Sequence, residues 1–143
     1  MSTENEVREA SKRFYQALNG VLNGKAEPMA EVWSHGASVT SLHPTGGREV
    51  GWEQVRSSLE RVAKMAAGGR VELVDAVIQV GGELAYELGV ERGEATLGGE
   101  KVAISQRVTN IYRRESGAWK LVHHHADAAP AMLDMMGRLK KKG

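Results

Sequence analysis

The sequence lacks cysteine, has only three prolines among its 143 residues, and is poor in aromatic side chains, which make up 5% of the chain. Without cysteine the protein has no thiol nucleophile, thiolate metal ligand or disulfide. No hydrophobic run approaches the roughly 18 residues that a membrane-spanning helix needs. Lysine and arginine (19) nearly balance aspartate and glutamate (18), so no strong positive field is available to attract nucleic acid. We therefore expect neither a membrane nor a nucleic acid as a partner.

The residues that are present are typical of one compact soluble domain. Hydrophobic residues make up 41% of the chain, and neither an internal repeat nor an interdomain linker divides it. We predict a single domain over residues 1–143. The stretch 1–13 has no apolar centre of the kind that a signal peptide needs, so we expect a cytoplasmic location.

Four segments are predicted to be helices. In the longer ones, hydrophobic residues recur at the three- and four-residue spacing of an amphipathic helix. The predicted helices cover residues 4–22, 28–34, 52–65 and 130–139. Pro28 and Pro130 support two of these starts, because proline is favoured in the first helical turn. The third helix is predicted to end at Gly68-Gly69.

The remaining segments read as strands. They cover residues 37–42, 71–80, 83–95, 102–114 and 118–127. The turn signals Gly81-Gly82, Gly98-Gly99 and Ser116-Gly117 separate the last four, and a loop is predicted over 45–47. Helices followed by an antiparallel meander predict an α+β domain, in which the helices cover one face of a curved sheet and leave the other free to bind a second subunit.

Two segments near the C-terminus carry a family resemblance, VTNIYRR at 108–114 and GAWKLVHHHAD at 117–127. They are similar to the C-terminal hairpin of SnoaL-like proteins within the nuclear transport factor 2-like superfamily. They also resemble the association domain of calcium/calmodulin-dependent kinase II, which has a similar small-small-proline sequence, here at 128–130. Upstream, residues 29–34, the His43-Pro44 loop and residues 51–56 are similar to other recurrent stretches of this group, in the same order.

The resemblance implies a cone-shaped nuclear transport factor 2-like fold, in which a curved antiparallel sheet wraps around N-terminal helices and leaves a pocket at the open end. Relatives in this superfamily include ketosteroid isomerase, polyketide cyclases, limonene epoxide hydrolase, dehydratases and non-catalytic assembly domains. A shared fold does not determine the activity. None of the glycine pairs forms a nucleotide fingerprint or a phosphate loop, and no cofactor is expected.

Strand alternation predicts which side chains of residues 102–114 point inward. The more apolar face consists of Val102, Ile104, Gln106, Val108, Asn110 and Tyr112. Asn110 and Tyr112 are predicted to enter the pocket mouth, where they can donate hydrogen bonds to a ligand oxygen, and Gln106 is predicted to contact the ligand. The alternative is that Asn110 and Tyr112 only satisfy neighbouring buried groups.

Three of the five histidines are consecutive, His123, His124 and His125. Alternation places His124 on one sheet face and its two neighbours on the other, but it leaves open which face lines the pocket. The resemblance to the kinase association domain implies that His124 points inward. His43 leaves the first strand near the predicted cone mouth. An imidazole titrates near neutral pH, so His43 and His124 are the candidate proton-transfer residues, with a purely structural role as the alternative.

The face of the last strand that carries His123 and His125 supports two further hypotheses. Together with Asp127 these histidines could converge on a metal ion, but a metal usually needs three or four protein ligands, so no metal site is predicted. The same face is predicted to form a homodimer interface. The predicted interface residues are Thr109, Ile111, Leu121 and His123.

Four aromatic residues, Tyr15, Trp33, Trp52 and Tyr86, are predicted to line or close the cavity. Trp33 and Trp52 stand on either side of the first strand and its loop, so one of them is expected to form a pocket wall. Among the three aspartates, Asp75 shares a strand face with apolar residues and could point inward.

Two functions from different classes follow. The first is a small-molecule pocket protein that acts on a hydrophobic, oxygenated metabolite by cofactor-independent acid–base chemistry, as an isomerase, cyclase, dehydratase or hydrolase. His43 or His124 would move protons, and Asn110 or Tyr112 would polarise an oxygen. The alternative is a non-catalytic ligand-binding or oligomerisation domain like the kinase association domain.

Overall fold

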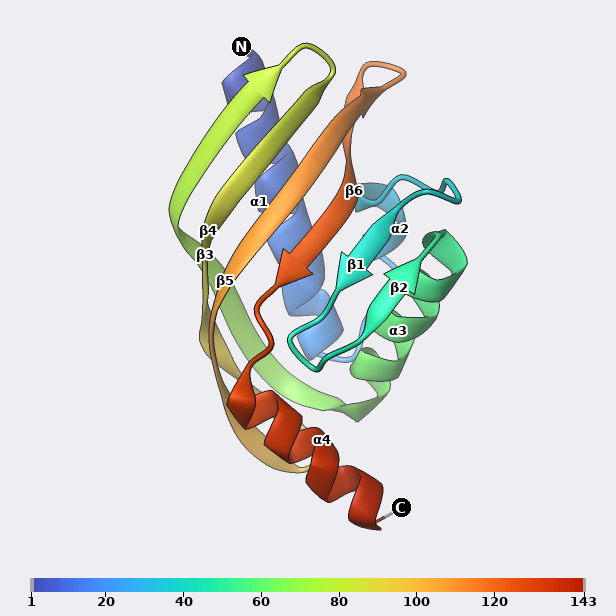
Figure 1. Cartoon of the computed structure of the whole chain (residues 1–143), viewed down its shortest axis with the longest axis vertical. Helices are drawn as coiled ribbons and strands as arrows, with labels where there is room; N and C mark the ends of the chain where they lie inside the picture. Colours follow the sequence, from blue (N-terminus) through green and yellow to red (C-terminus); the bar gives the residue numbers. More distant parts are fainter. Residues whose placement is uncertain (1, 143) are drawn as a thin grey trace.

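The computed structural model describes residues 2–142, which form helices and strands in the order shown in Figure 1. The helices are α1 (Thr3–Leu22), α2 (Met29–Val32), α3 (Trp52–Met65) and α4 (Pro130–Lys142). The strands are β1 (Thr40–Leu42), β2 (Arg48–Val50), β3 (Ala66–Gly81), β4 (Leu84–Leu97), β5 (Glu100–Glu115) and β6 (Ala118–Ala126). No helix within residues 2–142 is long and apolar enough to cross a membrane.

The strands form one sheet in the order β2-β1-β6-β5-β4-β3, antiparallel throughout except where β1 pairs with β6. The long strands β3, β4 and β5 curve around α1, while α3 lies beside β1 and β2 and α4 lies at the far end of the sheet (Figure 1). The predicted α+β class and the curved antiparallel sheet around N-terminal helices are therefore confirmed.

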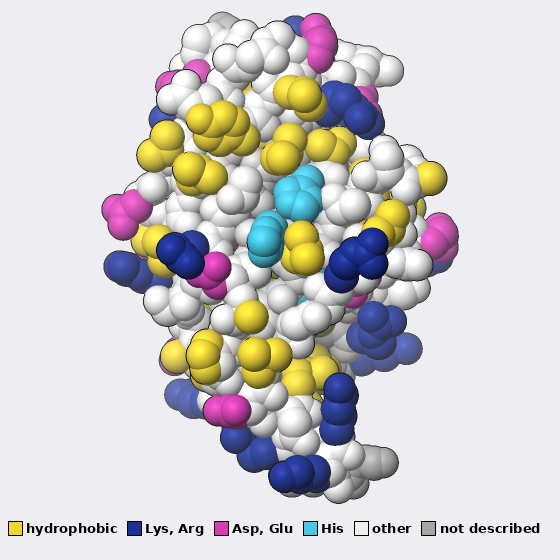
Figure 2. Space-filling model, viewed as in Figure 1, with side chains coloured by type: hydrophobic (Ala, Val, Ile, Leu, Met, Phe, Trp, Pro, Cys, Tyr) yellow, Lys and Arg dark blue, Asp and Glu magenta, His cyan; other side chains and the backbone are white. Residues whose placement is uncertain are grey.

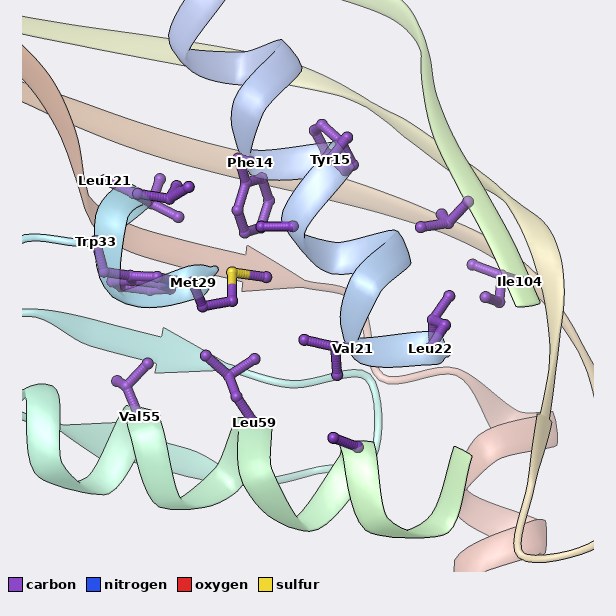
Figure 3. Packing of buried hydrophobic residues seen from close by; sticks show 14 of the residues in the cluster. Phe14, Tyr15, Val21, Leu22, Met29, Trp33, Val55, Leu59, Ile104 and Leu121 are labelled. Atoms are coloured by element: carbon purple, nitrogen blue, oxygen red, sulfur yellow. The ribbon is translucent and has the colours of Figure 1, made fainter. Parts of the chain in front are cut away.

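The core lies between α1, the following helices and the concave face of the sheet. The hydroxyl of Ser2 caps α1 by accepting a hydrogen bond from the backbone N–H of Asn5 at 3.2 Å. Side chains from α1, the α2 region and α3 point toward one another in Figure 3, among them Phe14, Met29 and Leu59. All three are buried, so the spacing of hydrophobic residues predicted the inward faces of these helices correctly.

The hairpin turns lie where the sequence predicts them. Gly82, Gly98 and Gly99 have positive φ, as do Ser116 and Gly117 in the last hairpin. These conformations allow the tight reversals between β3, β4, β5 and β6.

One glycine pair was interpreted wrongly. The third helix ends at Met65 rather than at Gly68-Gly69, and β3 follows at once from Ala66, so both glycines lie within the strand. A Cβ atom on Gly69 would stand 2.8 Å from the Cβ of Ala95 on the paired strand. Close strand approach therefore explains Gly69. No element is predicted from the sequence at the edge strand β2, which is only three residues long.

A β-bulge in β6 changes the predicted grouping of its side chains. Ile111 pairs with His123, whereas the next residue, Tyr112, pairs with Leu121, so Val122 is an extra residue without an opposite partner. The bulge reverses the alternation, and Leu121 therefore points inward on the same face as His124. Placing Leu121 on the outer face with His123 was wrong, because simple alternation does not anticipate the extra residue.

Candidate functional site

A cavity of about 100 Å³ lies between α1, α3 and the concave face of the sheet. Its wall is mostly apolar, and Phe14, Leu18, Val21, Met29, Leu59 and Ile104 form much of it. Six polar side chains also line it: Ser41, His43, Thr45, Glu91, Gln106 and His124. An apolar cavity with a few polar groups is the usual form of a small-ligand site.

Two of these groups, Ser41 and His124, belong to one row of cross-strand neighbours. Glu87 on β4 pairs with Asn110 on β5, Asn110 with His124 on β6, His124 with Ser41 on β1, and Ser41 with Glu49 on β2. All five residues are buried. Because paired residues lie on the same face of a sheet, the strand register alone brings these residues, far apart in the sequence, to one face of the sheet.

Glu87 lies at the β4 end of this row and is almost fully buried. Its Oε1 accepts hydrogen bonds from Asn110 Nδ2 at 3.1 Å and from the Tyr112 hydroxyl at 2.9 Å. Asn110 and Tyr112 do not line the cavity, and these donors are engaged with the protein itself. The inward orientation predicted for both residues is confirmed. The structure does not show their predicted contact with a ligand oxygen at the pocket mouth, because both side chains donate their hydrogen bonds to Glu87 instead.

Glu91 is the carboxyl group that faces the cavity. It is only 2% exposed, and its two oxygens accept hydrogen bonds from Tyr15 OH at 2.9 Å and Gln106 Nε2 at 2.8 Å. Burial raises the pKa of Glu91, and the nearby charge of Glu87 adds to this effect, whereas the two hydrogen bonds lower it. A carboxyl group with a raised pKa in an apolar cavity is suited to proton transfer.

The sequence interpretation missed both glutamates. Glu87 and Glu91 are separated from Ala85 and Ala95 by an even number of positions in β4, so all four side chains lie on the same face and point inward. This spacing can be read from the sequence. Glutamates are seldom buried, so an acidic residue within a strand is normally assigned to the solvent face.

His124 is buried, as the family resemblance implies, and its protonation pattern follows from its neighbours. Asn110 uses its amide nitrogen for Glu87 and for Tyr15 OH, so its Oδ1 must accept the 2.6 Å hydrogen bond from His124 Nδ1. Burial lowers the pKa of His124 to about 3. The ring is therefore neutral, carries its proton on Nδ1, and presents the lone pair of Nε2 4.0 Å from Glu91 Oε2.

His43 lines the cavity from the loop after β1. Its Nε2 lies 2.7 Å from Glu49 Oε2 and 3.0 Å from the hydroxyl oxygen of Ser58. Burial lowers the pKa of His43 more than Glu49 raises it. Its placement at the cavity agrees with the prediction, and its role in proton transfer stays a prediction.

The four predicted aromatic residues separate into three groups. Trp33 lines the cavity, and Tyr15 reaches it through its hydrogen bond to Glu91. Trp52 does not line it: its ring stacks on His35 with centroids 4.6 Å apart. Tyr86 is 45% exposed on the opposite face of the sheet, so placing it in the pocket was wrong. Ala85 and Glu87, the residues on either side of it in β4, point inward, so alternation turns Tyr86 outward.

The remaining candidates lie on the outer face. His123 lies 2.6 Å from Thr40 Oγ1, and Asp127 pairs with Arg107 at 2.7 Å. Asp75 lies at a bulge of β3 with φ 56° and is exposed. The inward orientation considered for it from the sequence is therefore wrong. Nowhere in residues 2–142 do three or more histidine or acidic side chains gather closely enough to hold a metal ion.

The raised pKa of Glu91 predicts how stability depends on pH. The folded protein binds more protons than the unfolded chain between the ordinary value of 4.5 and the folded-state pKa, so wild-type stability falls as pH rises through this window. Glu91→Gln has no such proton to lose. Urea unfolding at a series of pH values should therefore show the variant gaining stability relative to wild type from about pH 4.5 upward. A difference that does not change with pH would contradict the raised pKa.

Comparisons with known proteins agree on one family. The family model of the SnoaL-like domain matches residues 7–131. A candidate dehydratase of the nuclear transport factor 2-like family from Streptomyces avermitilis is 24% identical, with a TM-score of 0.76 over 87% of this chain and 94% of the other. A search of curated proteins found no significant match.

Two other solved structures have the same fold. A candidate calcium/calmodulin-dependent protein kinase type II association domain from Thiobacillus denitrificans is 26% identical, with a TM-score of 0.68 over 84% of this chain and 92% of that one. A candidate aromatic ring hydroxylase from Novosphingobium aromaticivorans is 16% identical, with a TM-score of 0.76 over 87% of each chain. Proteins with such different descriptions share this fold, so similarity alone does not select an activity.

Proposed function

The chain belongs to the SnoaL-like family, and from this membership we propose that it binds a hydrophobic, oxygenated small molecule and transforms it by cofactor-independent acid–base chemistry. The observation that carries the proposal is Glu91, a buried carboxyl group with a raised pKa at the polar end of an otherwise apolar cavity. In its ionised form it is the proton acceptor. Isomerisation, cyclisation, dehydration and hydrolysis all include such a step.

The neighbours of Glu91 have supporting roles in this proposal. Tyr15 and Gln106 hold the carboxylate in one orientation through their hydrogen bonds. Burial and the charge of Glu91 raise the pKa of Tyr15, so this side chain stays protonated: it donates to Glu91 and accepts from Asn110. Neutral His124 offers a second acceptor beside the carboxylate. His43, paired with Glu49, is the alternative proton-transfer group in the cavity wall.

Methionine methyl groups provide a direct test of ligand binding. Met29, Met65 and Met132 line the cavity, whereas Met136 does not. We expect small cyclic alcohols to shift the ¹³C-methyl NMR signals of the three lining methionines and to leave Met136 unchanged. Shifts spread equally over all four, or no shifts at any concentration, would remove the proposed binding site. The effect of Glu91 on turnover is a separate test, described in the Discussion.

A second function, that of an oligomerisation domain, is supported by the sheet face turned away from α1. Exposed apolar side chains cluster there on β3 and β4: Val77, Leu84, Tyr86 and Leu88. In Figure 2, histidine side chains lie near the middle of this face, with hydrophobic side chains above them. Large exposed apolar patches are typical of interaction surfaces, and we propose that this one joins two copies of the chain. A dimer is compatible with either function.

Analytical ultracentrifugation tests the dimer. The wild type should sediment at micromolar concentration with twice the 15.5 kDa mass of the chain. Leu88→Lys should shift the protein to the monomer, because a charge buried in an apolar interface is costly. Leu133→Lys is a matched control, since Leu133 on α4 is also 42% exposed but does not belong to the sheet face. A monomeric wild type, or equal effects of both variants, would contradict this interface.

A further inference from the structure

The polar end of the cavity contains hydrogen-bonding atoms that the protein leaves without partners. Gln106 donates its amide N–H to Glu91, and its Oε1 has no partner although it is buried. The hydroxyl of Ser41, also buried, has none either. Buried polar atoms normally find a partner, so unpaired ones in a cavity wall indicate where a ligand or water would bind.

The atoms at this end are almost all acceptors. Gln106 Oε1 can only accept, and the neutral His124 ring presents the lone pair of Nε2 because its proton is held on Nδ1 by Asn110. Glu91 Oε2 lies 4.0 Å from that nitrogen. The hydroxyl of Ser41, the strand neighbour of His124, can serve in either sense. Even if Glu91 is protonated, its single proton cannot satisfy both Gln106 Oε1 and His124 Nε2.

We propose that this end of the cavity selects ligands that donate a hydrogen bond, and that the donor is an uncharged hydroxyl group rather than a carbonyl. This inference rests on the proposed binding site and adds the class of its ligand. A hydroxyl can donate to one of Glu91, His124 and Gln106 while its oxygen accepts from Ser41. A carbonyl has no proton to give, so its oxygen would face lone pairs and leave the buried acceptors unpaired, which sites of this kind reject strongly.

An ammonium group also donates, but the surroundings favour the neutral alcohol. The remaining wall of the cavity is apolar, and an ammonium ion buried there must lose its hydration. Burial also raises the pKa of Glu91, which weakens the negative charge of the carboxyl group that lines the cavity. One unpaired donor, the indole N–H of Trp33, belongs to the cavity lining as well. A carbonyl ligand could accept from this N–H or from the Ser41 hydroxyl, but the buried acceptors would then stay unpaired.

Three compounds with one carbon skeleton test the proposal: cyclohexanol, cyclohexanone and cyclohexylamine. Affinities are measured from the methyl signals of Met29, Met65 and Met132. Cyclohexanol should bind about tenfold more tightly than cyclohexanone, the difference expected for one or two net hydrogen bonds. Cyclohexylamine should bind more weakly than the alcohol.

Variants assign the preference to the proposed atoms. His124→Phe keeps a ring of similar size and removes the acceptor nitrogen. It should lower the affinity for cyclohexanol toward that for cyclohexanone and leave the affinity for cyclohexanone unchanged. His125→Phe is the matched control, because it makes the same change at the next residue, which is exposed on the outer face. Thermal unfolding checks that each variant folds. If His124→Phe does not, Gln106→Leu replaces it, with the same expected loss of preference.

The outcomes separate this inference from the proposed function. Equal binding of alcohol and ketone, or tighter binding of the ketone, overturns the donor selectivity and leaves the binding site in place. Tightest binding by the amine also overturns it, because the site would then recognise a cation. If none of the three compounds shifts the lining methionines, both the inference and the proposed binding site fail.

Discussion

Glu91→Gln is expected to lower the rate of base-catalysed proton removal in the cavity by a factor of about 10²–10⁴, the usual contribution of a positioned general base. Glutamine has nearly the shape of glutamate and can still accept from Tyr15 or Gln106, but it cannot take up a proton. The cavity and its apolar wall therefore remain, and only the acceptor is lost.

A general probe reaction makes this measurable without the natural substrate. In the elimination of 5-nitrobenzisoxazole, a base removes the proton on carbon while the N–O bond breaks, and the product is a coloured nitrophenolate. The wild-type rate should rise with pH through the folded-state pKa of Glu91, which lies above 4.5, because only the ionised carboxylate is the base. Glu91→Gln should show no such rise.

A second glutamate of the same strand is the control. Glu94 is exposed and does not line the cavity, so Glu94→Gln should leave the rate and its pH profile unchanged. Equal rates for wild type and Glu91→Gln would exclude Glu91 as the base. If in addition His43→Ala lost the activity, proton transfer would belong to His43, the alternative group in the cavity wall.

Gly93→Ala is expected to destabilise the protein by at least about 3 kcal/mol, in the range of the most damaging single substitutions. Gly93 on β4 pairs with Val71 on the neighbouring strand β3, and a Cβ atom added at Gly93 would stand 1.8 Å from the carbonyl oxygen of Arg70. That oxygen belongs to the backbone, so a side-chain movement cannot relieve the overlap. The two strands would have to separate or lose their curvature.

Gly81→Ala isolates this steric effect. Gly81 lies at the end of β3, where an added Cβ atom would meet nothing within 4 Å and φ is not positive. Its substitution should change the free energy of unfolding by no more than about 0.5 kcal/mol. Urea unfolding followed by circular dichroism gives both values. Similar effects of the two substitutions would show that general loss of backbone freedom, rather than the close approach at Gly93, determines the result.

The curvature tested by Gly93→Ala also serves the site. Glu91 lies two residues away on the same face of β4, and Gly89 precedes it by two. At Gly89 a Cβ atom would come within 2.7 Å of Leu73. Small residues on both sides of Glu91 thus let β3 and β4 bend around α1. We expect loss of this bend to move the carboxylate as well as weaken the fold.

The sequence by itself determined the helices, the hairpins and the family. Hydrophobic spacing and glycine turns depend on neighbouring residues, so local patterns are sufficient to predict α1, α3 and the β3 to β6 meander. The inward faces of β5 residues, including Gln106 and Asn110, also followed from alternation. His124 was placed correctly through the resemblance to the kinase association domain.

Only the tertiary structure decided which polar groups form the site. A bulge at Val122 shifts the alternation of β6, and the strand register brings Glu87, Asn110 and His124 together from three strands. The burial of Glu91 depends on partners distant in the sequence, Tyr15 on α1 and Gln106 on β5. A carboxyl group becomes tolerable in an apolar interior only when such donors surround it, and no local pattern in the sequence records that they will.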